Sequence, residues 1–444
     1  MNQYTFSGTA KTVTIGAIIV GVVSMLLTWF MGADAYQSRF WSNFLHNGTF
    51  FLGIAMMAFF FITVCITAYA GWASVFKRVW EAMSSYMLYG FIFMVFIALA
   101  TYLHWNHLYH WTDPSAYIEG SETFDPILDG KKGFLNSNWY LFGTIIIVGT
   151  WVLFGRKMRA LSLAEDQDQG HDFAKHRKMR IWSAAFLPIM GFSSAAMIWL
   201  WLMSVDAHWY STLYAWHAAV SWFVSMICLT ILLLVYLKSK GLYKEVTVEH
   251  MHDLGKFLFA FSIFWTYMWF SQFMLIWYAN VGEETGYFLH RRQEYPILFY
   301  ANLAINFLIP FFVLMRNDTK RKFGSLTFVA VIVFIGHWLD FFLMIKPGAK
   351  INRDHAAHAA HGDTGHAVTA AHGAHDAAGH GAHEVAHHAA STFEAGYTLP
   401  GFLEIGTMIG FLGLFLFVTL TALSKAPLVA KNDPYLDESL HHHT

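Results

Sequence analysis

The sequence predicts an all-α integral membrane protein with ten transmembrane helices, and three observations lead to that prediction. Of the 444 residues, 56% are hydrophobic and only 13% are charged, about half the charged share of soluble proteins. Ten apolar segments are each long enough to cross a bilayer, which takes roughly 20 residues. These segments lack the alternation of apolar and polar residues that a membrane β-barrel requires. Because backbone groups in hydrocarbon must bond within their own segment, the segments are expected to be helices.

The ten helices are expected one after another along the chain. Their predicted ranges are 12–32, 46–70, 84–103, 138–155, 181–205, 212–237, 256–279, 296–315, 324–345 and 401–424. The first is interpreted as a retained helix, since the first ten residues contain no basic residue and no small-residue cleavage site follows the apolar run. Four regions result: a nine-helix core over 1–348, a His-rich linker over 349–399, the tenth helix over 400–424 and a tail over 425–444.

A weak internal repeat indicates how the helices group. Ser84, which opens the third predicted helix, follows His46 by 38 residues, and Gly255, just before the seventh, follows His217 by 38. This spacing predicts two four-helix bundles, formed by helices 2–5 and 6–9. Helices 1 and 10 would be peripheral, one outside each bundle. Repeat-built membrane proteins commonly bind their ligands where the two halves meet.

The basic residues predict the orientation in the membrane. With the N-terminus inside, 20 of the 28 Lys and Arg residues fall on the inner side and 8 on the outer side. This asymmetry follows the positive-inside rule and predicts that both termini are cytoplasmic. The loop from residue 104 to 138 and the His-rich linker would then face outward.

Composition also excludes several functions. Cys65 and Cys228 both lie inside apolar runs, so there is no C-x-x-C-H haem-attachment motif and no cysteine set for an iron–sulfur cluster or a structural zinc ion. A net charge of −1 without a basic block argues against nucleic-acid binding. We therefore expect the chain to bind no metal and no redox cofactor of its own.

The first candidate site lies in the stretch "FIGHWLDFF" of the ninth helix. A charged side chain at mid-bilayer costs about 2.5 kcal/mol or more, so each one within a span suggests a function. His337 and Asp340 are three residues apart and share a helical face. A carboxylate beside an imidazole suits a proton relay or a group that accepts a proton from a quinol hydroxyl. The alternative is a buried pair that only stabilises helix packing.

Further candidates form an outer polar layer. Asp206 and His208 sit at the membrane rim, with His217 about one and a half turns inside the sixth helix. His46 and Glu404 lie just inside the second and tenth helices, in the same layer. Together these residues could carry protons or face a quinone. The alternative for each of them alone is an interfacial residue in contact with headgroups and water.

The most conspicuous feature is a run of ten histidines between His355 and His388. The spacing of His355, His358 and His361 would allow two-histidine chelation on a helix. However, several glycines interrupt the run, and no acidic or thiol ligand recurs at a fixed spacing. We expect a disordered or loosely packed linker; adventitious metal binding or proton buffering is the alternative.

Two stretches carry a resemblance to a known family. The runs "FSQFMLIWYANVGEETGYFLHRRQEY" and "YANLAINFLIPFFVLMRNDTKRK" resemble the second NrfD-like (polysulfide-reductase-type, ActF-type) membrane subunit of bacterial alternative complex III, a quinol:cytochrome c oxidoreductase. The resemblance covers nearly the whole chain apart from the His-rich insertion. It implies a multi-pass subunit of the bacterial inner membrane, within a respiratory complex that oxidises quinol near the outer face.

The resemblance also implies partners and roles. Subunits of this type carry no redox centre, while iron–sulfur clusters and c-type haems reside in partner subunits. The implied partners are a paralogous NrfD-like subunit with the quinol site, an iron–sulfur subunit, multihaem c-type cytochrome subunits, a terminal oxidase and membrane lipids. This chain would contribute a proton path and a quinone-facing surface. His337, Asp340, Asp206, His208 and His217 match the outer polar layer of such subunits.

Two other classes of function are open at this stage. The first is a secondary or metal-ion transporter that uses the His-rich loop and the pair His337 and Asp340. Such transporters are expected to place several His and Asp ligands on facing helices, and only one pair is deep here. The second is a b-haem cytochrome with His217 and His337 as axial ligands, although these two residues are expected at different depths.

Overall fold

The computed structural model describes residues 3–32, 37–121, 123–167, 173–360 and 394–443. Within these residues, ten helical segments are long and apolar enough to cross a membrane, so the chain is a multi-pass membrane protein. They are α1 (Gly8–Phe30), α2 (Ser38–Thr67), α3 with α4 (Lys77–Ser84, Met87–Tyr102), α6 (Ser137–Glu165), α7 (Ala174–Trp201), α8 (Leu213–Ser239), α9 (Val248–Ala279), α11 with the π-helix η5 and α12 (Pro296–Leu303, Ala304–Leu308, Ile309–Leu314), α14 (Phe323–Ala360) and α16 (Phe402–Ser424).

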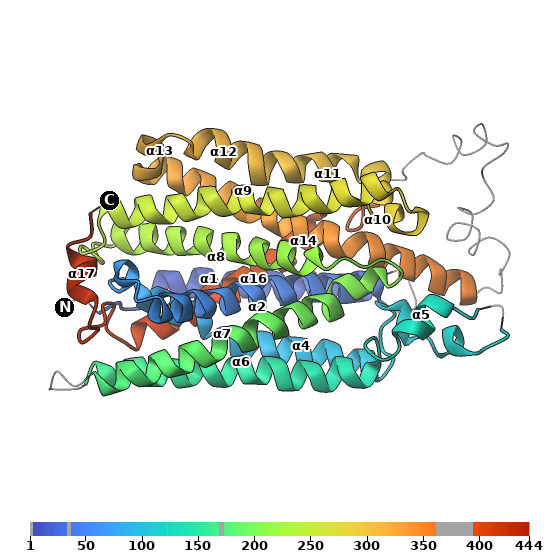
Figure 1. Cartoon of the computed structure of the whole chain (residues 1–444), viewed down its shortest axis with the longest axis horizontal. Coiled ribbons are helices and arrows are strands. Elements are labelled where there is room, and N and C mark those ends of the chain that lie inside the picture. Colours follow the sequence, from blue (N-terminus) through green and yellow to red (C-terminus); the bar gives the residue numbers. More distant parts are fainter. Residues whose placement is uncertain (1–2, 33–36, 122, 168–172, 361–393, 444) are drawn as a thin grey trace.

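Short elements cap both ends of this helical body. They are η1 (Gly71–Ala73), η2 (His110–Thr112), η3 (Pro114–Tyr117), α5 (Pro126–Lys131), η4 (Met203–Asp206), α10 (Gly282–Glu294), α13 (Asn317–Arg321) and α17 (Leu436–Leu440). The long helices run side by side, and both termini lie at the same end, which we call the termini end (Figure 1). The helices α5 and α10 lie at the other end, which we call the loop end. An even number of spans places both termini on one side, whichever side that is.

The all-helical prediction is confirmed for the described residues, where the one non-helical pairing is a β-bridge between Ala395 and Leu399. Several helices extend beyond their predicted ranges into polar sequence. The largest difference is in α14, which we predicted to end at residue 345 but which continues to Ala360. It runs through Pro347 and Gly348, which lie just beyond the predicted end. The start of the predicted His-rich linker is therefore helical, while residues 361–393 lie outside the described part of the chain.

The centre of the protein is formed by α2, α8 and α14, whose apolar stretches are the most buried of the ten. The helix α8 contacts α2, α7, α9 and α14, while α2 also contacts α3, α4 and α7. Gly53 of α2 is necessary here, because a Cβ atom at that position would lie 2.0 Å from the indole of Trp222 in α8. The two helices thus meet with an aromatic ring pressed against bare backbone.

The first and last membrane helices, α1 and α16, pack against each other along a row of small residues. A Cβ atom on Gly21 would lie 2.3 Å from the Cα atom of Gly410, and one on Gly406 would lie 2.1 Å from Ser24 Oγ. Small residues at this spacing allow two membrane helices to approach closely. We expected one peripheral helix outside each bundle, and this was wrong: α1 and α16 lie together beside α2 and α3.

The tail after α16 is packed against the termini end. Lys77 of α3 forms an ion pair with Asp433, and Ser439 accepts a hydrogen bond from the backbone N–H of Val75. Burial alone would raise the pKa of Asp433, but the Lys77 ammonium outweighs it, so the pKa lies below its usual value. The predicted tail therefore closes the end of the helical body.

The close contact of α1 with α16 leads to a stability prediction. We expect Gly21→Ala to lower the free energy of unfolding by about 1–3 kcal/mol, because the added methyl group forces the two backbones apart. The measurement is the thermal unfolding midpoint of the purified protein in detergent micelles. Gly16→Ala is the matched control on the same helix, since a Cβ atom there meets nothing within 4 Å. Equal midpoints for the two variants would contradict the described packing.

Candidate functional site

The deepest polar group of the protein is built around Asp340, which is 2% exposed. The indole N–H of Trp265 on α9 donates to Asp340 Oδ2 at 3.0 Å, and the amide of Asn302 on α11 donates to Oδ1 at 2.8 Å. His217 Nε2 on α8 lies 3.5 Å from Oδ2, at ion-pair distance. Four helices thus converge on one carboxylate, and within the described residues His217 is its one ionisable partner at that distance.

The amide of Asn302 is itself held by the π-helix η5. Asn306, within η5, donates to Asn302 Oδ1 at 2.6 Å. The wide turn brings Asn306 against α14 at Gly336, where a Cβ atom would lie 2.2 Å from Asn306 Oδ1. Single π-helical turns within α-helices occur frequently at functional sites. Gly336, the residue before His337, is therefore required for this arrangement.

His337 is close to this group but is not bonded to Asp340. Its Nδ1 lies 2.8 Å from Ser221 Oγ on α8, in a hydrogen bond whose direction depends on the tautomer. The rings of His337 and His217 both contact Trp265, at centroid distances of 5.5 and 5.3 Å. We predicted that Asp340 would face His337; in the structure the imidazole nearest its carboxylate is that of His217.

A cavity of about 30 Å³ joins the Asp340 group to the loop end. Its walls include Asp340, His217 and Asn302 on one hand and Tyr287 and Arg291 of α10 on the other. One ordered water requires roughly 10–15 Å³, so the cavity can hold water. It is far too small for a haem group between His217 and His337, whose shared neighbour is the Trp265 ring.

Arg291 closes the cavity and is fully engaged. Its guanidinium donates to Asp206 Oδ2 at 2.7 Å and stacks 3.4 Å above the ring of Tyr287. Burial alone would lower the pKa of Arg291, but Asp206 outweighs it and raises the pKa above its usual value, so the charge is retained. Gly348 is needed beside this pair, since a Cβ atom there would lie 2.9 Å from the carboxylate carbon of Asp206.

Arg291 also explains why α14 can contain a proline. Pro347 has no N–H, so the carbonyl oxygen of Leu343, four residues earlier, receives no hydrogen bond from the helix. Arg291 Nε donates to that oxygen at 2.9 Å. A freed carbonyl in a membrane protein must find such a partner. Pro347 and Gly348, just beyond the predicted end of the ninth helix, are thus the docking point of a charged side chain.

A second polar group lies on another face of α14. Lys346, fully buried, donates to Ser42 Oγ at 2.8 Å and to Asn43 Oδ1 at 2.6 Å. Asn43 in turn donates to Glu404 Oε1 at 2.9 Å, and Arg39 binds both oxygens of Glu404 at 2.8 and 2.9 Å. Six residues separate Asp340 from Lys346, which turns their side chains toward different neighbours. Lys346 therefore faces α2 and α16 while Asp340 faces α9 and α11.

His46 of α2 lies between the two groups without joining either. Its Nε2 lies 2.9 Å from the carbonyl oxygen of Trp338, and its ring stacks on the Trp338 indole at 4.8 Å. The indole donates to Asn47 Oδ1 at 3.0 Å. His46 thus contacts α14 one residue after His337, through the opposite side of the helix from Asp340.

His208 is the remaining predicted site residue, and it lies at the exposed rim. It pairs with Asp125, which precedes α5. Burial would raise the pKa of Asp125, but the hydrogen bond with His208 outweighs it, helped by the backbone N–H groups of Ile127 and Leu128, so the pKa is lowered. His208 belongs to the loop end and takes no part in the buried groups.

The structure therefore brings five of the seven predicted residues to two buried groups, while His46 lies between these groups and His208 lies at the exposed rim. His217, His337 and Asp340 share the deep group; Asp206 lies at its outer edge; Glu404 belongs to the Lys346 group. Sequence reasoning missed Lys346, Arg291 and Arg39 as members of these groups. The available signal was position along the chain. Lys346 directly follows the predicted ninth span, and Arg39 lies in the first turn of α2, yet both were assigned to loops.

One further cluster could hold a metal ion. Among the described residues, the one group of three or more His, Cys, Asp or Glu close enough to share an ion is Glu165, His176 and Asp433, with ligand atoms within 4.8 Å. It lies at the termini end, and the Lys77 ammonium pairs with Asp433 and lies 3.7 Å from Glu165. The Lys77 ammonium therefore competes with any metal ion for these carboxylates.

The docking of Arg291 on α14 leads to a prediction of energetic coupling. Arg291→Met is expected to lower the free energy of unfolding by about 3 kcal/mol, since it leaves the Asp206 carboxylate, which is only 13% exposed, without its charged partner. In a Pro347→Ala background the loss should be smaller by about 1 kcal/mol, because the alanine supplies the missing N–H to Leu343. Unfolding in mixed micelles measures both values.

Arg292→Met is the control for this cycle, since Arg292 is exposed and adjacent. Its effect on the free energy of unfolding should be small, and the effects of Arg292→Met and Pro347→Ala should simply add. If the effects of Arg291→Met and Pro347→Ala on the free energy of unfolding simply add, the hydrogen bond from Arg291 to Leu343 contributes nothing to stability.

Comparisons with known proteins leave this geometry as the main source of functional argument. No protein-family model matches the chain. No curated protein matches it significantly either.

Proposed function

We propose that this chain is a cofactor-free membrane subunit of a respiratory quinol-oxidising complex of the alternative complex III type, and that the Asp340 group is its proton-carrying site. In this proposal the loop end faces outward, the termini are cytoplasmic, and helices 2–5 and 6–9 form two four-helix bundles. The observation that carries the proposal is the buried Asp340 carboxylate with His217 3.5 Å away.

A proton-carrying role is supported by the charge balance of this group. A buried carboxylate is costly unless it is paired, and the partners of Asp340 are two neutral donors and one imidazole. Asp340 and His217 can share one proton, whose position sets the charge of both. Since no Lys or Arg among the described residues forms an ion pair with Asp340, that proton is not displaced by a fixed cation.

Buried polar atoms without a hydrogen-bond partner also support a proton-carrying role. Within the described residues, His337 Nε2 and Asn306 Oδ1 are buried and have no hydrogen-bond partner, and His217 Nε2 has the Asp340 carboxylate only at ion-pair distance. Buried polar atoms are rarely left so, and such atoms suit the binding of water or a quinol hydroxyl. The cavity that reaches Arg291 and Tyr287 supplies the space for water toward the loop end. A proton released at Asp340 would leave by that route.

The proposal assigns the electron transfer to other subunits. The sequence offers no ligand set for haem attachment or iron–sulfur clusters, so electrons would pass through partners of that kind. The resemblance in the stretches 270–295 and 300–322 supports this assignment. The first of these includes Arg291 and the second includes Asn302 and Asn306, so the similar stretches carry part of the polar group.

A metal-ion transporter is the alternative that the sequence left open, and the geometry favours it less. The three-residue group able to share an ion lies at the termini end, away from His337 and Asp340. The His-rich residues 361–393 are outside the described part of the chain. Metal uptake by vesicles that contain only this chain would favour the transporter.

The proposed function is tested by purification from native membranes followed by proton-release measurements. The chain should co-purify with iron–sulfur and c-type haem subunits. Asp340→Asn should lower the rate of proton release coupled to quinol oxidation at least tenfold, because an amide cannot hold the proton. Spectra of the haems show whether the partners are still present in the variant complex.

Asp318→Asn is the matched control, since that carboxylate is 75% exposed and lies outside the group. If Asp340→Asn does not fold, His337→Gln tests the same site with a smaller change. Purification of the chain without redox subunits would overturn the proposal. An unchanged rate of proton release in both Asp340→Asn and His337→Gln would overturn it as well.

A further inference from the structure

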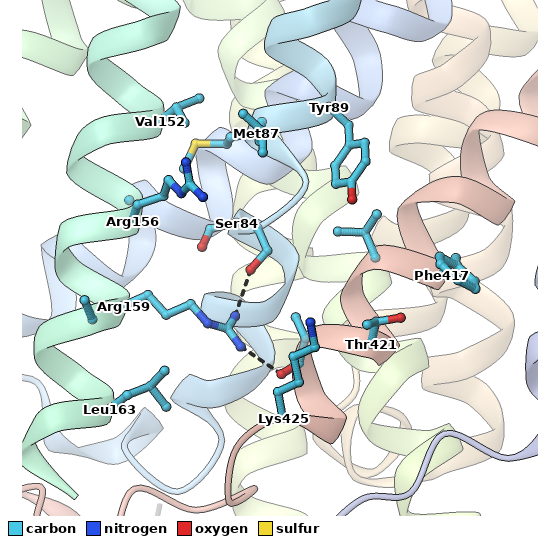
Figure 2. A pocket seen from close by; sticks show the side chains of 16 residues that line it. Ser84, Met87, Tyr89, Val152, Arg156, Arg159, Leu163, Phe417, Thr421 and Lys425 are labelled. Carbon is cyan, nitrogen blue, oxygen red and sulfur yellow. Dashed lines mark hydrogen bonds between the residues drawn. The ribbon is translucent and has the colours of Figure 1, made fainter. Parts of the chain in front are cut away.

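A large cavity lies far from the Asp340 group, near the termini end. It has a volume of about 460 Å³ and is walled by α3, α4, α6 and α16 (Figure 2). Small-ligand sites commonly span roughly 300–1,000 Å³. The proposed proton path makes no use of it, so the cavity requires its own explanation.

The cavity is apolar at one end and basic at the other. Met87 and Val152 line the part toward mid-membrane, where the Arg156 side chain reaches them, while Arg159 and Lys425 line the part toward the termini (Figure 2). On α6, Val152 is followed by Arg156 one turn later, and Arg159 follows within another turn. The lining thus changes from hydrocarbon-like to cationic over two helical turns.

Three cations line the cavity, and among the described residues Arg156, Arg159 and Lys425 form no ion pair. The carboxylate whose charge acts on Arg159 is that of Glu81, and it is already paired with Arg78 at 2.6 Å. An unpaired cluster of three cations between membrane helices favours an anion.

One of these cations is held in place by neutral groups. Arg159 donates to Ser85 Oγ and to the carbonyl oxygens of Glu81 and Ala422, at 2.7–2.8 Å (Figure 2). These bonds fix the guanidinium between α3 and α16 without neutralising it. Its charge is therefore directed into the cavity by a rigid support.

The opening of the cavity faces the lipid. Tyr89 is 40% exposed, and Arg156 and Lys425 are exposed at the same rim. A ligand that enters from there would place an apolar part against Met87 and Val152 and an anionic part against the three cations. A molecule with both parts in that order is a phospholipid.

From this lining we infer that the cavity binds an anionic phospholipid, with its phosphodiester between Arg156, Arg159 and Lys425 and its acyl chains along α4 and α6. This site does not depend on the proposed function. The phosphate is recognised by charge and by the fixed guanidinium of Arg159. The apolar wall supplies the preference for a lipid over a soluble phosphate.

The test uses the purified full chain, delipidated in a neutral detergent. Phosphatidylglycerol, phosphatidylcholine or inorganic phosphate is added, and binding is followed by native mass spectrometry and by the thermal unfolding midpoint. We expect phosphatidylglycerol to bind and raise the midpoint, and the other two to have no comparable effect. The double variant Arg156→Gln, Lys425→Gln should weaken phosphatidylglycerol binding by about thirtyfold.

Lys157→Gln is the matched control, because Lys157 is an exposed neighbour of Arg156 that does not line the cavity. It should bind phosphatidylglycerol like the wild type. Equal weakening by Lys157→Gln, unchanged binding by the double variant, or an equal effect of phosphatidylcholine or inorganic phosphate would each overturn the inference.

Discussion

The hydrogen bond from Arg291 to the carbonyl oxygen of Leu343 is the constraint on which the loop end depends. Pro347 frees that oxygen, and a helix buried in a membrane protein cannot leave it without a donor. Arg291 supplies the donor, and its charge in turn requires Asp206, which fits only beside Gly348. One missing N–H group thereby fixes α10 and η4 on α14, and with them the outer wall of the cavity that leads to Asp340.

The helix α14 separates two polar groups of different character. The Asp340 group contains one carboxylate, neutral donors and an imidazole, so a single proton changes its charge. The Lys346 group instead contains a bidentate pair between Arg39 and Glu404, with Lys346 bonded to neutral oxygens. Its fixed charges are held by close contacts on both sides. The first group suits proton exchange, and the second suits the locking of α2, α14 and α16.

The sequence was sufficient to predict the membrane class and the ten spans, because hydrophobic length alone decides these. It also identified His217, His337 and Asp340, since ionisable residues within spans are rare. It failed where two residues meet across helices: the partner of Asp340 is His217 and not the neighbouring His337. Spacing along one helix predicts which residues share a face, but it does not predict which side chains of neighbouring helices contact that face.

The ninth helix is longer than predicted for a definite reason. The predicted range is an apolar run that stops at residue 345, and Pro347 and Gly348 follow it, residue types that end helices in water. Within a membrane protein the lost hydrogen bond is replaced by another helix, so α14 continues to Ala360. Lys346 and Arg353, counted as loop charges, are therefore helical residues with buried or partly buried partners. A local rule could not anticipate a donor that lies some fifty residues away in sequence.

The contact of Gly21 with Gly410 has a consequence for how the protein is made. The helix α1 is synthesised long before α16, yet α16 is the helix it packs against most extensively. Their contact can form only after residues 402–424 have been synthesised. A ribosome stalled before residue 402 would therefore leave the small-residue face of α1 without this partner.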